Sequence, residues 1–305
     1  MAKKPIEVTS LKADTNPKTW AEAPLYWATI EYHRFWTSID LPRLKVLSDA
    51  KGKMSPELFR DITREYRVSR NFKGIDEQNN NDDTAANEIC NILNAAQPSF
   101  TESLSERLAR AKEIVGNIRP YTAKASPKKK TQVTESNEES ATEESKTVDA
   151  ASAVTKLIWF LKPKGWTVFD RYAAEGVGIR NYPAIDKMEY FYKALILENF
   201  EALVEEMQQC IKEKSRMLAE IPAARILDTL FMARGERGAG SDHGVALTAA
   251  YLSQLPADIQ SDLSAVANIL HGKFGQCSLV QKEQPESRGK MWQRQKEKEN
   301  KGSAT

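Results

Sequence analysis

Hydrophobic side chains recur along most of the chain at the three- and four-residue spacing of one helical face. The clearest run extends from Phe200 to Leu218. A second run, Ser152 to Leu161, is apolar around most of its circumference, which predicts a helix buried on most sides. No segment of useful length alternates in the manner of a β-strand. The pattern therefore predicts an all-α fold.

Residues typical of helix N-termini predict where several further helices begin. Ser55 followed by Pro56 is typical of a helix start, and Ser103 with Glu106 forms a capping box. The aromatic-rich stretch 20–47 is interpreted as a packed helix, with a base-stacking platform as the alternative. Further helices are expected at residues 85–96, 104–118, 183–196, 226–231 and 245–255, and from residue 256 onward.

The composition changes sharply in the middle of the chain. Between residues 122 and 149 a lysine cluster is followed by glutamates among Ser, Thr and Asn, with almost nothing to bury. Such a segment is expected to be a disordered linker. We expect residues 20–121 and 150–280 to form one composite helical domain around it, with a flexible arm at 1–19 and a disordered charged tail at 281–305.

Composition narrows the class of protein only a little. At 305 residues and 41% hydrophobic, the chain can bury one substantial core or two modest ones. A net charge of +2 argues neither for nor against a nucleic-acid partner. The three cysteines lie far apart without a CxxC pair, which is typical of a reducing cytosol. Since neither a signal peptide nor an apolar run of ~20 residues is evident, we predict a cytoplasmic protein without a membrane partner.

No motif of a standard enzyme class is present. The chain lacks a GxGxxG, a P-loop, an HExxH and a GxSxG. Its histidines, His33, His243 and His271, have no metal-like spacing, so neither a metal nor a cofactor is expected. The glycine-rich stretch 235–244 is interpreted as a mobile helix connection, with phosphate binding by its backbone as the alternative.

The turn after the 152–161 helix delivers a carboxylate. Lys162-Pro163-Lys164-Gly165 ends that helix, because proline disfavours helical backbone at the preceding residue and glycine frees the chain. The apolar stretch 166–169 then leads to Asp170, which opens a second segment at 171–174. Asp170 can cap the free backbone N–H groups of that segment, or it can be held out into a cleft. Both interpretations stay open.

This layout resembles bacterial proteins with the 8-oxoguanine DNA glycosylase fold, relatives of the helix-hairpin-helix DNA glycosylases. In that family a helix, a proline-containing turn and an aspartate at the next helix start follow one another, as Lys156–Pro163 and Trp166–Asp170 do here. The flanking helices are also similar, at 89–94, 104–107, 190–192 and 227–235. The resemblance covers roughly residues 85 to 235.

The resemblance implies a double-stranded DNA partner and a role in DNA repair, genome maintenance or phage defence. In the family the target base is swung out of the duplex. The aspartate, here Asp170, stabilises the cationic sugar that forms as the base leaves. By their position in the sequence, Lys162, Lys164, Arg171 and Arg180 would bind backbone phosphates.

Two departures limit what the resemblance implies. The acidic linker occupies the place of the family's DNA-binding hairpin, and Gly176-Val177-Gly178 resembles a hairpin tip without room for the helix that should follow. No lysine stands at the position of the lyase-type nucleophile, since Lys146 is in the linker and Lys156 is inside a helix. We therefore expect either a monofunctional DNA N-glycosylase relying on Asp170 or a non-catalytic DNA-binding relative. The alternative is a helical protein–protein interaction module that recruits partners through the linker or the C-terminal tail.

Overall fold

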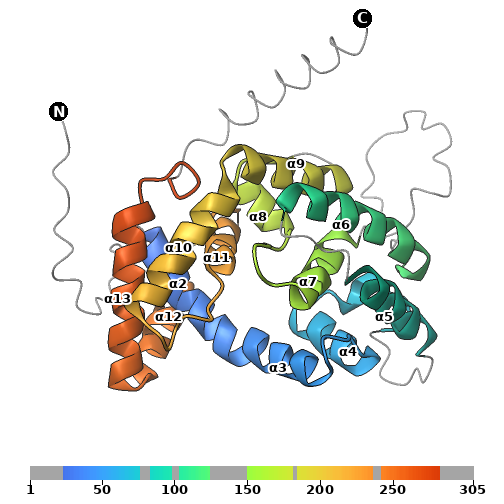
Figure 1. The fold of residues 1–305 in the computed structure, drawn as a ribbon, viewed down its shortest axis with the longest axis horizontal. Helices are drawn as coiled ribbons and strands as arrows, with labels where there is room; N and C mark the ends of the chain where they lie inside the picture. The colour runs from blue at the N-terminus through green and yellow to red at the C-terminus, as the bar shows by residue number, and fades with distance from the viewer. Residues whose placement is uncertain are drawn as a thin grey trace, which may run out of the picture. The chain divides into compact units, whose positions relative to one another are not determined.

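The computed structural model describes residues 23–75, 83–97, 103–123, 150–180, 184–235 and 242–281 (Figure 1). Within these ranges the chain is helical without a β-strand, and one isolated antiparallel bridge joins Phe72 to Thr122. The predicted all-α class is confirmed. The arm expected at 1–19, the linker from residue 124 onward and the tail from residue 282 onward lie outside the described residues.

The chain divides into two compact units whose segments alternate along the sequence. The first unit comprises residues 1–42, 102–105 and 163–305, and the second comprises residues 43–101 and 106–162. The boundary near residue 42 falls inside one helical run. That run consists of α2 (Pro24–Phe35), a π-helical turn η2 (Trp36–Asp40) and α3 (Leu41–Asp49).

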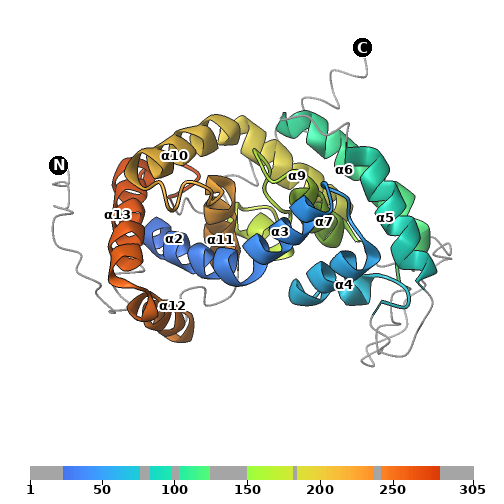
Figure 2. The same ribbon diagram turned by 60° about the horizontal axis from the view of Figure 1, so that its bottom comes forward.

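The first unit is built around α2 and α11. Besides α2 and η2 it contains α8 (Arg171–Gly176), α9 (Ala184–Leu197), α10 (Phe200–Lys214), α11 (Ala223–Gly235), α12 (Asp242–Gln254) and α13 (Ala257–Phe274). Helix α2 packs against α11, α12 and α13, and α11 packs in turn against α8 and α10 (Figure 2). The connection expected at 235–244 is shorter than predicted, because α11 includes Gly235 and α12 already begins at Asp242.

The second unit contains α3 beyond Pro42, α4 (Pro56–Glu65), a 3-10 turn η3 (Ser69–Asn71), α5 (Thr84–Ala96), most of α6 (Leu104–Ile118), a 3-10 turn η5 (Arg119–Tyr121) and α7 (Ala151–Leu161). The predicted cap of α4 is confirmed, since Ser55 Oγ accepts a hydrogen bond from the Leu58 backbone N–H at 3.2 Å. Helix α6 begins and ends where the sequence predicted.

Helix α7 is the most deeply buried helix of the second unit. All of its residues except Ser152 are buried, as its continuous apolar circumference predicted. The Trp159 and Phe160 rings meet edge to face with centroids 4.9 Å apart. The helix ends at Leu161, and the carbonyl oxygen of the next residue, Lys162, accepts a hydrogen bond from Arg107 at 3.4 Å.

Candidate functional site

The segment that carries Asp170 is fastened to α9 by aromatic side chains. Trp166 is fully buried and stacks on Tyr192, with ring centroids 4.9 Å apart and planes inclined by 27°. The Tyr192 hydroxyl donates a hydrogen bond to the Thr167 carbonyl oxygen at 2.8 Å. Phe169 packs next to Phe191 with centroids 5.9 Å apart. The strap 166–169 is therefore fixed by packing and by a buried hydrogen bond before the chain reaches Asp170.

Asp170 is the N-cap of α8. Its backbone is extended, with φ −136° and ψ 154°, and its Oδ1 accepts a hydrogen bond from the Tyr172 N–H at 2.9 Å. Of the two roles that the sequence left open, the structure therefore realises the cap. The side chain nevertheless stays half-exposed. A carboxylate that is both fixed by its cap and reachable from solvent can still face a ligand at the surface of the first unit.

Helix α8 lies against α11 with the two backbones in contact. A Cβ atom added to Gly176 would lie 1.9 Å from the Phe231 carbonyl oxygen. A Cβ added to Gly235 would lie 1.8 Å from the Tyr172 carbonyl oxygen. Both are far shorter than a van der Waals contact, so the close approach requires glycine at each crossing point. The stretch 176–178, which resembled a hairpin tip in the sequence, is the end of α8 and the turn that follows it.

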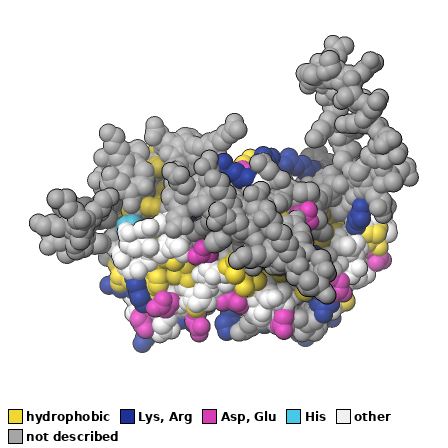
Figure 3. Space-filling model, turned by 90° about the horizontal axis from the view of Figure 1, so that it is seen from above, with side chains coloured by type: hydrophobic (Ala, Val, Ile, Leu, Met, Phe, Trp, Pro, Cys, Tyr) yellow, Lys and Arg dark blue, Asp and Glu magenta, His cyan; other side chains and the backbone are white. Residues whose placement is uncertain are grey.

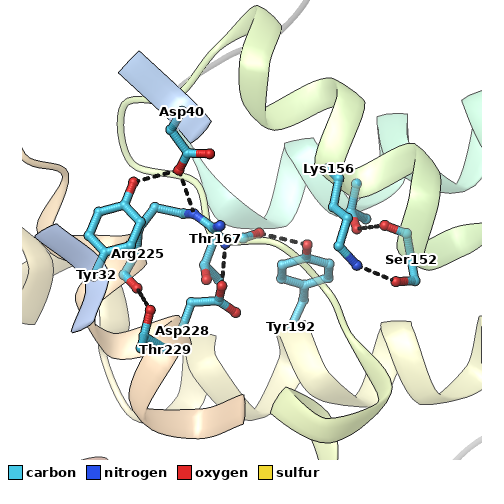
Figure 4. A network of polar contacts seen from close by, with 10 residues as sticks. Tyr32, Asp40, Ser152, Lys156, Thr167, Tyr192, Arg225, Asp228 and Thr229 are labelled. Atoms are coloured by element: carbon cyan, nitrogen blue, oxygen red, sulfur yellow. Dashed lines mark hydrogen bonds and ion pairs between the residues drawn. The ribbon is translucent and has the colours of Figure 1, made fainter. Parts of the chain in front are cut away.

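A buried polar network holds α11 against α2 (Figure 4). The Tyr32 hydroxyl donates to Asp40 Oδ2 at 2.9 Å, and Arg225 Nε lies 3.8 Å from the same oxygen. Arg225 also forms an ion pair with Asp228 one turn later on α11. All four side chains are at most 5% exposed. The carboxylates of Asp40 and Asp228 thus share the guanidinium of Arg225. Because Asp40 is the last residue of η2, the network connects this π-helical turn to α11, the helix against which α8 packs.

An ion cluster on α8 was missed by the sequence-based predictions. Glu175 Oε1 lies 2.9 Å from Arg171 Nε and 3.5 Å from Lys187 Nζ, a buried ammonium on α9. Burial alone would raise the pKa of Glu175, but the hydrogen bond from Arg171 and the charge of Lys187 outweigh it, so this pKa is lowered. The four-residue spacing of Arg171 and Glu175 was the available sequence signal.

The predicted phosphate-binding residues divide between the two units. Lys164, Arg171 and Arg180 are exposed and belong to the first unit, before, within and after α8. Lys162 is half-buried and belongs to the second unit. On the face drawn in Figure 3, basic and acidic side chains are interspersed over the described surface.

Lys156 lies within the second unit and is almost completely buried. It is 4% exposed, and its Nζ donates to Ser152 Oγ at 2.7 Å (Figure 4). The Nζ atom also lies 5.9 Å from the centre of the Tyr66 ring. Lys156 therefore lies inside α7, as the sequence predicted, and its amine is buried among the residues that pack around that helix.

Comparison of the chain with known protein families, with curated proteins and with solved structures finds no match. Among the described helices none is both long and apolar enough to cross a membrane. Within the same residues no group of three or more His, Cys, Asp or Glu side chains is arranged to hold a metal ion.

Proposed function

We propose that the protein binds duplex DNA through the surface around the start of α8, and that Asp170 acts there as the carboxylate of a monofunctional DNA N-glycosylase. The proposal depends mainly on one observation: the Asp170 carboxylate is held by its hydrogen bond to the Tyr172 N–H and is at the same time half-exposed to solvent. The glycosylase resemblance of the sequence around residues 156–170 supports the same role.

The chemistry requires a fixed negative charge. When the bond between a base and its sugar breaks, positive charge develops on the sugar, and a carboxylate held beside it lowers the barrier without reorganising during the reaction. Water then adds to the sugar and leaves an abasic site. The strap 166–169 and the cap bond supply the rigidity that this role demands. The duplex would bring the extruded nucleotide to the carboxylate.

Lys164 and Arg180 are candidate phosphate ligands, because both are exposed and lie a few residues before and after α8 in the sequence. Arg171 must first exchange its pairing with Glu175 for a phosphate. Removing one phosphate-binding cation should reduce the slope of log K against log salt by about 0.9. We expect Lys164→Ala and Arg180→Ala to weaken duplex binding and reduce this slope. The matched control is Lys214→Ala, an exposed lysine at the end of α10.

The catalytic part is tested with substitutions that keep the cap. Asn and Ser are both preferred N-cap residues, so Asp170→Asn and Asp170→Ser remove the charge while helix α8 stays capped. We expect abasic-site formation on a panel of damaged or modified duplexes to fall by about 10²–10⁴ in both variants, at nearly unchanged thermal stability. Asp258→Asn, an exposed carboxylate in the first turn of α13, should retain activity.

The outcomes separate the competing functions. Salt-dependent duplex binding without any abasic product would indicate a non-catalytic DNA-binding relative. An unchanged product yield in Asp170→Asn would remove this carboxylate from the mechanism. If the protein does not bind duplex DNA at low salt, the DNA proposal is wrong and a protein–protein interaction module is favoured.

A further inference from the structure

A thiol and an amine meet on the surface of the first unit, away from α8. Cys210 on α10 has its sulfur 3.6 Å from the Nζ of Lys273 on α13. Glu206, one turn before Cys210, places an Oε1 atom 3.4 Å from the same Nζ. Cys210 is half-buried, and the Lys273 side chain is 49% exposed. The pair therefore bridges two packed helices and can be reached by a small reagent.

We propose that Cys210 and Lys273 form an oxidation-sensitive cross-linking site, in which a peroxide converts the pair into a covalent sulfur–nitrogen bond between α10 and α13. This inference is independent of the DNA-binding proposal.

The reaction has two steps with hydrogen peroxide as the oxidant. First the Cys210 sulfur takes one oxygen from the peroxide, giving a sulfenic acid and water, so sulfur is oxidised by two electrons and the peroxide is reduced. The Lys273 nitrogen then attacks the sulfenic sulfur. The S–OH bond breaks as the S–N bond forms, hydroxide leaves as water, and the ammonium has released its proton to solvent. The products are a sulfenamide and two water molecules in all.

Proximity favours this route over further oxidation. A sulfenic acid condenses with a nearby nucleophile in preference to reacting with a second peroxide when the nucleophile is already in contact. Here the two reacting atoms are 3.6 Å apart on helices that already pack together, so the bond forms without a large backbone movement. Glu206 holds the Lys273 ammonium beside the sulfur through its ion pair. Although desolvation would lower the pKa of Lys273, the charges of Cys210 and Glu206 raise it, so the ammonium must lose a proton before it attacks and the reaction should accelerate as the pH rises.

The other two cysteines are internal comparisons. Cys90 is buried, and burial raises its pKa to about 12, which leaves almost no thiolate at neutral pH. Cys277 is half-buried like Cys210, but no hydrogen bond to its sulfur is present among the described residues. We therefore expect only Cys210 to lose its thiol to an S–N product, while Cys277 forms ordinary sulfur oxides.

The experiment treats the full-length chain with hydrogen peroxide and follows its mass. The expected product is about 2 Da lighter than the reduced protein, returns to the starting mass with dithiothreitol, and resists tryptic cleavage after Lys273. Lys273→Arg keeps the positive charge but lacks the reactive amine, and should instead accumulate oxygen adducts on Cys210. Cys277→Ser removes the competing disulfide partner and should still give the lighter product.

Three results would overturn the proposal. Loss of the lighter product in Cys277→Ser would show that it is a disulfide. Its persistence in Lys273→Arg would show that another group reacts with the sulfur. If peroxide adds only oxygen atoms to Cys210 in the wild-type protein, with cleavage after Lys273 unimpaired, the amine does not take part.

Discussion

The close backbone contact between α8 and α11 makes a sharp prediction at Gly176. In Gly176→Ala the new methyl group would lie 1.9 Å from the Phe231 carbonyl oxygen and 2.8 Å from the carbonyl carbon. Ordinary contact begins at 3.4 Å, so α8 would have to move by about 1.5 Å relative to α11. Because the obstructing atoms are backbone, no side-chain rotation can relieve the overlap.

The energetic cost follows from the size of this overlap. Forcing one extra carbon into a packed contact typically costs about 1–3 kcal/mol of unfolding free energy. Each kcal/mol should lower the thermal midpoint by roughly 2–4 °C in a unit of this size. The loss would exceed the gain of about 0.4–1 kcal/mol that a helical Gly→Ala change gives where space is open.

Gly272→Ala is the matched control in the same unit. This residue is also helical, and an added Cβ would meet nothing within 4 Å. We expect Gly272→Ala to be as stable as the wild type or more stable in a urea or thermal unfolding experiment, and Gly176→Ala to be clearly less stable. If the two variants unfold at the same midpoint, the backbone contact between α8 and α11 is not present in the protein.

Three further changes test other parts of the first unit. Tyr192→Phe removes the buried hydrogen bond to the Thr167 carbonyl and should cost about 0.5–1.5 kcal/mol in urea unfolding, without affecting secondary structure by circular dichroism. Arg225→Met leaves two buried carboxylates without their shared cation and should destabilise the unit by about 3–5 kcal/mol, whereas the exposed Arg180→Met should be nearly neutral. Burial lowers the pKa of His33 to about 4, from 6.5. The unfolded chain therefore binds more protons between these values, so stability should be complete above pH 6.5 and decline as the pH falls toward 4; His33→Gln should flatten that part of the profile.

Local signals in the sequence were sufficient for most helix boundaries. The proline and glycine after α7 end that helix as predicted, and Gly165 has a positive φ of 67° that favours glycine. Asp170 was identified as the residue that opens α8, with capping as one of its two possible roles. These features depend only on residues a few positions apart, which a single sequence displays directly.

Features that depend on distant partners were not predicted. Nothing near Gly176 in the sequence indicates that this glycine is needed for packing against α11, because the obstructing atom belongs to Phe231 and comes close only after folding. The pairing of Glu175 with Lys187 likewise requires α8 and α9 to pack together. The π-helical turn was missed because its one-residue expansion leaves the helical spacing of the surrounding aromatic residues almost unchanged.

Helices that pack together in the first unit lie far apart along the chain, and this has a consequence for biosynthesis. Helix α2 packs against α11 and α13, which are translated about 200 residues later. Because translation adds about 5–20 residues per second, the apolar face of α2 remains uncovered for roughly 10–40 s before α11 and α13 are synthesised. During that interval Leu25 and Ile30, fully buried in the finished protein, are available to chaperones or to other nascent chains.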